Sequence, residues 1–206
     1  EDVERDINKA IYYFSLAASQ NYPEAQHNLG FIYYEGKYVT QNIKKAMHYY
    51  TLAASNNFAD SLFNLACIYE RGEYFPKDIN KAIYYYSLAA EKNIPQAQFN
   101  LGVYYFEGKF ISQDIKKAIY YFTLAANQNI SQAQYNLGVF YQEGKVVKKD
   151  INKAIHYYSL ASRLNNSDAQ YNLGLFYYQS NSHINHIEKG IYYLKLSSKN
   201  RCVDAH

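Results

Sequence analysis

An asparagine returns at a fixed step of thirty-six residues along this sequence, at Asn28, Asn64, Asn100, Asn136 and Asn172. An amide both donates and accepts hydrogen bonds, so a row of amides could bond the backbone of an extended peptide regardless of its side chains. The same asparagines lie at the edge of an apolar stripe, where each could instead bond a neighbouring helix, as buried amides usually do. The spacing leaves both interpretations open, and the structural one is preferred.

Groups that could catalyse a reaction or bind a metal do not converge in this sequence. His183 and His186 are three residues apart, but no Cys or third His accompanies them at metal-ligand spacing. No glycine-rich phosphate loop follows a strand, and no Ser or Cys has a nucleophile motif around it. Catalysis needs unlike groups at one place, whereas this chain repeats like groups along a line. We therefore expect no enzyme, no bound metal and no cofactor.

The asparagines belong to a longer repeated phrase. PEAQHNLGFIYYEG, at residues 23–36, returns as ADSLFNLACIYERG, PQAQFNLGVYYFEG, SQAQYNLGVFYQEG and SDAQYNLGLFYYQS. A second phrase, DINKAIYYFSLAA at residues 6–18, keeps the same step. It recurs from Asn42, Asp78, Asp114, Asp150 and, weakened, His186. A fixed period between roughly 20 and 50 residues is typical of stacked structural repeats.

Both phrases predict helices. In the second phrase the apolar residues fall on one helical face, and Asp6 is placed to cap the N-terminus. The same capping role is predicted for Asn42, Asp78, Asp114 and Asp150. In the first phrase Gly36 stands where a left-handed residue ends a helix, and Gly30 predicts a close approach of two backbones. The sequence therefore predicts an all-α solenoid of antiparallel helix pairs.

The expected array occupies the whole chain, residues 1–206. It consists of a lone helix of the second type at 6–20, repeats at 23–58, 59–94, 95–130, 131–166 and 167–199, and the start of a further repeat at 202–206. The chain opens on the polar stretch EDVER and stops where a new helix is expected. We therefore expect further repeats or another domain on either side.

The pattern A-Q-x-N-L-G-x-x-Y-x-x-G, followed after a loop by D-I-x-K-A-x-x-Y-Y-x-L-A-A, resembles the SEL-1-like repeat family, a relative of the tetratricopeptide repeat. The resemblance implies a right-handed superhelix in which the first helix of each pair lines a concave groove. The last repeat departs from the pattern at Ser180, Gly190 and Ser197–Ser198. It is either a capping unit or a repeat that has drifted.

The groove predicted in this way is an aromatic ladder edged by acids and amides. Besides the five asparagines, its residues are His27, Phe31, Tyr34, Phe63, Phe99, Phe106, Tyr135, Tyr171 and Tyr178. Aromatic anchors ringed by polar groups are the usual composition of a protein-binding hot spot. The alternative is that these rings only pack on adjacent helices, since apolar residues are commonly exposed.

Composition narrows the choice of partner and compartment. The 206 residues carry a formal net charge of only +3, with 26 Tyr and no Trp. Cys67 and Cys202 stand at non-equivalent repeat positions, which favours a reducing, cytoplasmic compartment over a disulfide-linked secreted array. No apolar run approaches the length of a membrane span, and no signal peptide opens the chain.

These observations favour a non-catalytic scaffold or adaptor whose groove binds a peptide or helix of a partner protein. Two alternatives remain. One is a self-associating spacer that buries its tyrosine faces against copies of itself. The other is a helical repeat that binds single-stranded nucleic acid, which requires a basic groove, whereas the predicted groove is acidic to neutral.

Overall fold

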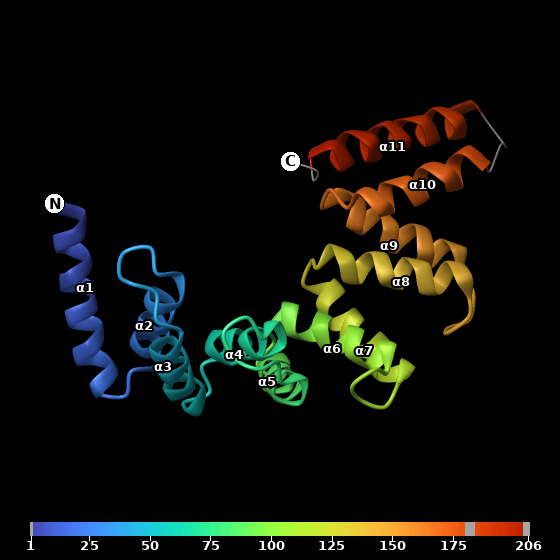
Figure 1. Ribbon diagram of the computed structural model, residues 1–206. Coiled ribbons are helices and arrows are strands. Elements are labelled where there is room, and N and C mark those ends of the chain that lie inside the picture. The colour runs from blue at the N-terminus through green and yellow to red at the C-terminus, as the bar shows by residue number, and fades with distance from the viewer. Residues whose placement is uncertain (1, 180–183, 204–206) are drawn as a thin grey trace. The chain divides into compact units, whose positions relative to one another are not determined.

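The computed structural model describes residues 2–179 and 184–203, and within those ranges it is all-helical, without strands. Its helices follow one another along the chain (Figure 1). They are α1 (Asp2–Ser19), α2 (Pro23–Glu35), α3 (Ile43–Ser55), α4 (Ala59–Arg71), α5 (Ile79–Glu91), α6 (Pro95–Glu107), α7 (Ile115–Asn127), α8 (Ser131–Glu143), α9 (Ile151–Arg163), α10 (Ser167–Gln179) and α11 (Ile184–Val203). The predicted helical class and helix pairs are confirmed.

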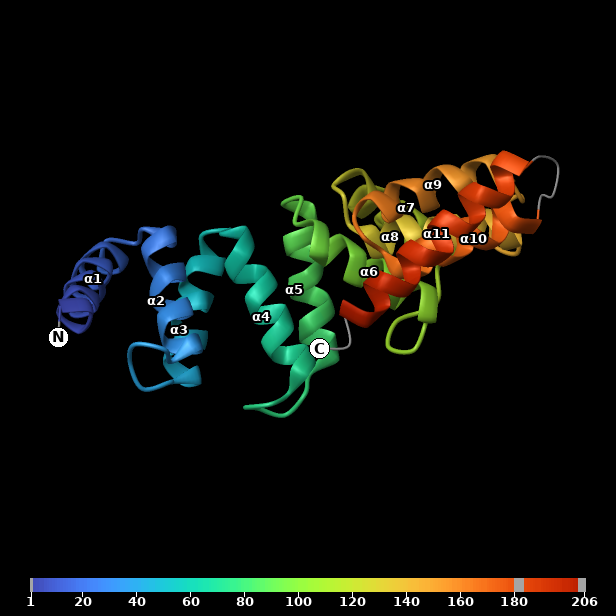
Figure 2. The same cartoon turned by 90° about the horizontal axis from the view of Figure 1, so that it is seen from above.

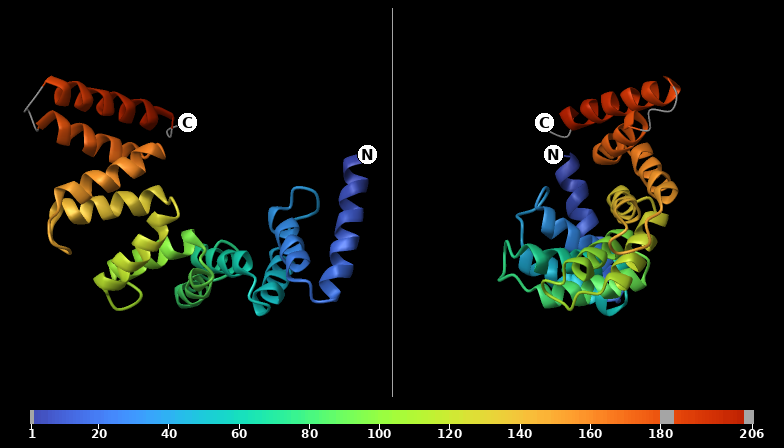
Figure 3. Two further views of the ribbon diagram at one scale, coloured as in Figure 1. Left: turned by 180° about the vertical axis from the view of Figure 1, so that it is seen from behind. Right: turned by 90° about the vertical axis from the view of Figure 1, so that its right-hand side faces the viewer.

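The chain forms two compact units, Glu1–Ala97 and Gln98–His206. In unit 1, each helix from α1 to α5 packs against the next one along the chain. In unit 2, the helices from α7 to α11 pack in the same sequential way, and α10 and α11 lie side by side in Figures 1 and 3. Each helix therefore buries its apolar face against its neighbours in sequence, as in repeat proteins generally.

The second helix begins at a capping side chain in four of the helix pairs. Asn42 accepts a hydrogen bond at 3.0 Å from the backbone N–H of Lys45. The carboxylates of Asp78, Asp114 and Asp150 make the equivalent bond, so these four predicted caps are confirmed. The prediction for Asp6 was wrong, because α1 starts at Asp2 and places Asp6 inside the helix. The preceding residues, DVER, contain no Gly or Pro that would stop the helix from extending.

Helices end on left-handed residues of two kinds. Gly36 has a φ of 65° at the end of α2, as the sequence predicts. The loop after such a glycine leads into the next helix, and Figure 2 shows the loop between α4 and α5 reaching past the ends of both. The second kind of helix end, an asparagine, was not predicted from the sequence. The helices of the other type are followed by asparagines with φ between 60° and 64°, namely Asn21, Asn57, Asn93, Asn129 and Asn165.

The last helix shows what happens without such an asparagine. Arg201 stands at the position that follows Asn165 by one repeat, and a side chain like Arg seldom adopts a positive φ. Accordingly α11 continues through Val203. The further repeat expected at 202–206 stays a prediction, because α11 ends at Val203 and residues 204–206 lie outside the described part of the chain.

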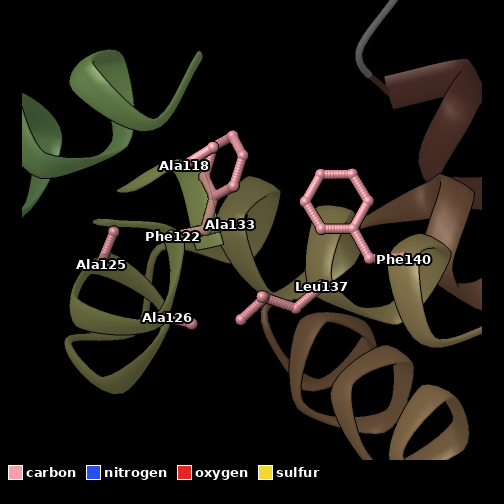
Figure 4. Close-up of a cluster of buried hydrophobic side chains, with 7 residues drawn as sticks. All are labelled: Ala118, Phe122, Ala125, Ala126, Ala133, Leu137 and Phe140. Atoms are coloured by element: carbon pink, nitrogen blue, oxygen red, sulfur yellow. The ribbon is translucent and has the colours of Figure 1, made fainter. Parts of the chain in front are cut away.

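An aromatic ring fits over a glycine at the centre of the helix pair. A Cβ atom on Gly30 would lie 2.6 Å from the ring of Tyr50, so any side chain there would displace the ring. The close approach that Gly30 predicts is thus to a side chain rather than to a backbone. Over Gly102 in unit 2 the ring is that of Phe122, which packs with Leu137 and Phe140 among small alanines (Figure 4).

Pairs of stacked tyrosines join the helices on another face of each repeat. The rings of Tyr69 and Tyr85 lie 5.8 Å apart and almost parallel, and the ammonium group of Lys81 lies 5.1 Å from the Tyr69 ring. A lysine near the start of the second helix therefore makes a cation–π contact with a tyrosine of the first helix. Equivalent lysine–tyrosine pairs are Lys45–Tyr33, Lys117–Tyr105, Lys153–Tyr141 and Lys189–Tyr177.

Candidate functional site

The predicted aromatic ladder packs against the buried ring of its own repeat. The Phe63 ring lies 5.8 Å from that of Tyr86. Phe99 and Phe122 are 5.7 Å apart, and Tyr135 is 5.8 Å from Tyr158. These half-buried rings therefore contribute to the core, as the alternative interpretation expects, while one edge of each stays accessible.

His27 begins this ladder and is held by its neighbours. Its ring lies 5.5 Å from Tyr50 and 5.0 Å from Phe58, and its Nδ1 lies 2.9 Å from the hydroxyl oxygen of Ser61. Burial lowers its pKa, although the carboxylate of Asp60 opposes that shift. The neutral imidazole is thus the form that this environment favours.

Unit 1 contains a pocket of about 260 Å³ between α2 and α4. Four predicted groove residues, Phe31, Tyr34, Phe63 and Asn64, line it. The other lining residues, which the predicted groove omits, are Glu35, Tyr50, Cys67, Ile68 and Arg71. Its walls are mainly aromatic and apolar, with a carboxylate and a guanidinium among its lining groups, which is the usual character of a binding pocket.

Arg71 is held in place at this pocket by Tyr34. Its Nη1 donates to the Tyr34 hydroxyl at 3.2 Å. The Tyr34 ring meets the Tyr74 ring edge-on at 6.4 Å, and Gln41 donates both to the Tyr34 carbonyl and to the Tyr74 hydroxyl. Burial raises the pKa of Tyr34, although the Arg71 charge opposes that shift. The guanidinium is therefore fixed by a network that links the loop between α2 and α3 to the loop between α4 and α5.

The floor of the pocket shows one role of the asparagine row. Burial raises the pKa of Tyr50 well above its ordinary range, and a hydrogen bond from the Asn64 amide to its hydroxyl opposes that shift. In unit 2, burial raises the pKa of Tyr158 to about 12, and Asn172 makes the equivalent bond. At two positions, then, the asparagine bonds a tyrosine of the preceding helix, as the structural interpretation requires.

The asparagine row is not uniform. Asn136 lies one repeat before Asn172. The residue fourteen positions before Asn136 is Phe122, which has no hydroxyl that the amide could bond. The side chain of Asn136 therefore lacks the tyrosine partner that Asn172 has. Asn28, Asn100 and Asn136 are half-buried like the others.

Unit 2 contains a pocket of about 320 Å³ formed by α8, α9, α10 and the loop before α9. Only Asn172 of the predicted groove residues lines it. Its other lining residues are Gln142, Lys149, Ile151, Ala154, Ile155, Tyr158, Leu175, Phe176 and Gln179. The hydroxyl of Tyr158 donates to Gln142 at 2.6 Å, which ties α9 to α8 at the pocket.

The remaining predicted residues lie outside both pockets, and several are open to solvent. Tyr171 is 40% exposed, and the Arg201 guanidinium lies 5.3 Å above its ring. Phe106 is 37% exposed and packs 5.1 Å from Phe140, whereas Tyr178 is 52% exposed. The outer residues of the predicted groove thus form no single site with the pockets.

Residues 2–179 and 184–203 contain neither a metal-binding cluster nor a membrane-spanning helix. No group of three or more His, Cys, Asp or Glu side chains could hold a metal ion there. Over the same ranges, no helix combines the length and the apolar character needed to cross a membrane. His183, which was not predicted from the sequence to be a metal ligand, lies outside the described part of the chain.

Comparison with known proteins decides the family. The Sel1 repeat matches residues 1–22, 23–58, 59–94, 95–130, 131–166 and 167–201. The chain belongs to the Sel1 repeat family. Proteins of this family generally act as scaffolds for protein–protein interaction and are generally non-catalytic. A comparison with curated proteins found no match.

Solved structures show the same fold. A Sel1 repeat protein from Oxalobacter formigenes is 30% identical with a TM-score of 0.82, over 96% of this chain and 84% of that one. A protective antigen of uropathogenic Escherichia coli with an SLR fold is also 30% identical, with a TM-score of 0.85. That match covers 92% of this chain, which spans only 40% of the antigen.

Proposed function

We propose that this Sel1 repeat chain is a non-catalytic adaptor that binds a peptide segment or helix of a partner protein in its inter-repeat pockets. The observation that carries the proposal is the pair of pockets lined by aromatic and apolar side chains around a tyrosine–asparagine floor. Pockets that combine an apolar wall with a few fixed polar groups bind side chains of a partner. The general role of the family as scaffolds for protein–protein interaction supports the same function.

The experiment is selection of random displayed peptides on the immobilised chain, followed by affinity measurement on the enriched peptides. Phe63→Ala removes a wall of the unit 1 pocket, and Leu175→Ala does the same in unit 2. The matched control is Tyr84→Ala, which removes an aromatic ring that is 60% exposed and lines neither pocket. Circular dichroism verifies that each variant keeps its helices.

We expect at least one pocket variant to weaken the enriched peptides about tenfold, and Tyr84→Ala to leave them unchanged. Failure to enrich any peptide would refute the proposal. So would enriched peptides that bind both pocket variants as tightly as the unaltered chain.

The compartment and the neighbours of this chain remain part of the proposal. The free, half-buried thiol of Cys67 and the non-equivalent cysteine positions support a proposed reducing, cytoplasmic compartment. We further propose that the adaptor tethers its bound peptide near other domains or repeats of a longer chain.

A further inference from the structure

We propose that the unit 1 pocket selects an acidic peptide segment, in which a bulky apolar residue enters between Phe31 and Phe63 and a neighbouring Asp or Glu pairs with Arg71. The inference rests on the proposed function and adds the chemistry of the bound segment. It assigns the Arg71 position, which the predicted groove omits, as a determinant of specificity.

The charge at this position is unusual among the repeats. At one repeat before and after Arg71 the chain has Glu35 and Glu107. The next two repeats have Glu143 and Gln179. A position that is otherwise acidic or neutral thus carries a cation only beside the unit 1 pocket, where it lines the wall.

The Arg71 guanidinium retains most of its hydrogen-bonding capacity. Of its five N–H donors, the Tyr34 hydroxyl accepts one. Glu73 acts on Arg71 only through its charge, with no ion pair between the two. The ion pairs within the described ranges are Lys81–Asp78, Lys145–Glu143 and Arg201–Asp168.

Arg201 shows how a partnered arginine looks in the same chain. Its Nη2 lies 2.7 Å from a carboxylate oxygen of Asp168, so its charge is already matched. Arg71 has no such carboxylate and is held by Tyr34, so a bound segment can supply it. Arginine pairs with carboxylates through two parallel N–H bonds, which adds geometric selectivity to charge.

The other charged group of the pocket sets the orientation of the segment. Glu35 lines the pocket from α2 and repels an acid placed beside it, whereas Arg71 stands on α4. Glu70, the acid beside Arg71 on α4, already accepts a hydrogen bond from the Tyr86 hydroxyl at 2.7 Å. The acid of the segment therefore lies at the α4 side, and its apolar neighbour lies among the rings.

A side chain within the segment fits this site better than the carboxylate at a peptide's end. Within a helix, the free backbone N–H groups that commonly bind terminal carboxylates are those of the first turn. The lining residues of α4 begin at Phe63, beyond the first turn of a helix that starts at Ala59. The lining residues of α4 thus offer a guanidinium but no free backbone N–H.

The test uses peptides enriched on the unaltered chain, synthesised with an amidated C-terminus. Each is paired with a version in which Asp or Glu is replaced by Asn or Gln, and affinities are measured by fluorescence anisotropy. Arg71→Gln introduces the residue type found at position 179. Arg163→Gln, at an exposed arginine of α9 outside both pockets, is the control.

We expect Arg71→Gln to weaken the acidic peptides roughly tenfold or more and their amide versions little, with Arg163→Gln changing neither. Equal losses for both versions, or enriched peptides without acids that still depend on Phe63, would overturn the inference and leave the adaptor function intact. Binding that disappears on C-terminal amidation would also overturn it. Absence of any bound peptide would refute the adaptor function itself.

Discussion

The pockets of the two units have the same tyrosine and asparagine at their floor and differ in the side chains around it. Six positions line both pockets at a separation of three repeats, which identifies them as equivalent sites. The pairs are Tyr34 and Gln142, Tyr50 and Tyr158, Asn64 and Asn172, Cys67 and Leu175, Ile68 and Phe176, and Arg71 and Gln179. Only the tyrosine and the asparagine of the floor are the same in both.

The difference shows how one repeat can support two recognition surfaces. In unit 2, Gln142 accepts a hydrogen bond from the floor tyrosine. In unit 1 the equivalent residue is Tyr34, whose hydroxyl accepts a hydrogen bond from the Arg71 guanidinium instead. A buried ring and an amide thus maintain the helix packing, while the positions around them are free to change charge and bonding.

Loss of the floor ring should be the most damaging change in either unit. Tyr50 and Tyr158 are only 1% and 3% exposed, and truncation of such a ring leaves a cavity. We expect Tyr50→Ala and Tyr158→Ala each to lower the free energy of unfolding by about 3–5 kcal/mol. Urea unfolding followed by circular dichroism measures this loss, and amide hydrogen exchange assigns it to a unit.

The matched control is Tyr120→Ala, at a tyrosine that is 59% exposed. It should change the free energy of unfolding by no more than about 0.5 kcal/mol. If one floor variant were as mild as this control, the two floors would not be equivalent and the comparison would fail.

High pH should weaken the floor through the same tyrosines. Burial raises the pKa of Tyr158 from 10.0 to about 12, so the folded state favours the neutral phenol. Its contribution to stability is complete below pH 10 and is lost as the pH rises through 12. This rise in pKa corresponds to a loss of about 2–3 kcal/mol in the free energy of unfolding at high pH.

Tyr158→Phe tests this pH dependence, because phenylalanine already serves at the equivalent position 122. The unaltered chain should be the more stable at pH 8 and should lose this advantage between pH 10 and 12. Burial shifts the pKa of Tyr50 in the same direction, so Tyr50→Phe should do likewise in unit 1. Parallel stability curves for variant and parent would contradict the proposed role of the buried phenols.

A smaller effect concerns a hydrogen bond that one repeat lacks. In unit 1 the buried Gln26 accepts from Asn56, thirty residues later. In unit 2 the residue at that spacing from Gln134 is Leu164, and the side-chain oxygen of Gln134 has no partner. We expect Leu164→Gln to raise the free energy of unfolding by about 1 kcal/mol, because it supplies the donor.

Leu164→Ala is the control, since it removes a leucine that is 41% exposed without adding a donor. Conversely, Asn56→Leu should destabilise unit 1 by a similar amount. A gain of equal size for the Gln and Ala variants would show that loss of an exposed apolar group, rather than the new bond, is responsible.

The sequence predicts the helices well because their signals are local. Four capping side chains and the glycine ends lie where the repeated phrases place them. The asparagine ends were missed, although Asn21 and its equivalents recur at the same step and Asn is the residue other than Gly that best tolerates a positive φ. The sequence signal for these helix ends is therefore also local.

The pockets were predicted less completely because they depend on contacts between repeats. Alignment of the copies indicates candidate groove residues of the first helix, and four of them, the varying Phe31, Tyr34 and Phe63 and the invariant Asn64, line the unit 1 pocket. It does not indicate that Tyr50, from the second helix, forms the floor. Arg71 had a sequence signal, since it is the cation at a position of acids and amides.

Low pH should produce the smallest effect and confine it to unit 1. Burial lowers the pKa of His27 in the folded state, partly offset by Asp60, so stability is complete above pH 6.5 and falls as the pH drops below that value. The equivalent positions in unit 2 hold Phe99, Tyr135 and Tyr171, which do not acquire charge on acidification.

Hydrogen exchange at pH 7.5 and 5.5 should therefore show faster opening of α2 and α4 at the lower pH. His27→Phe, which introduces the residue type of Phe63, should abolish the difference. Equal acceleration in α8 and α10 would assign the acid sensitivity to groups common to both units and remove His27 as its source.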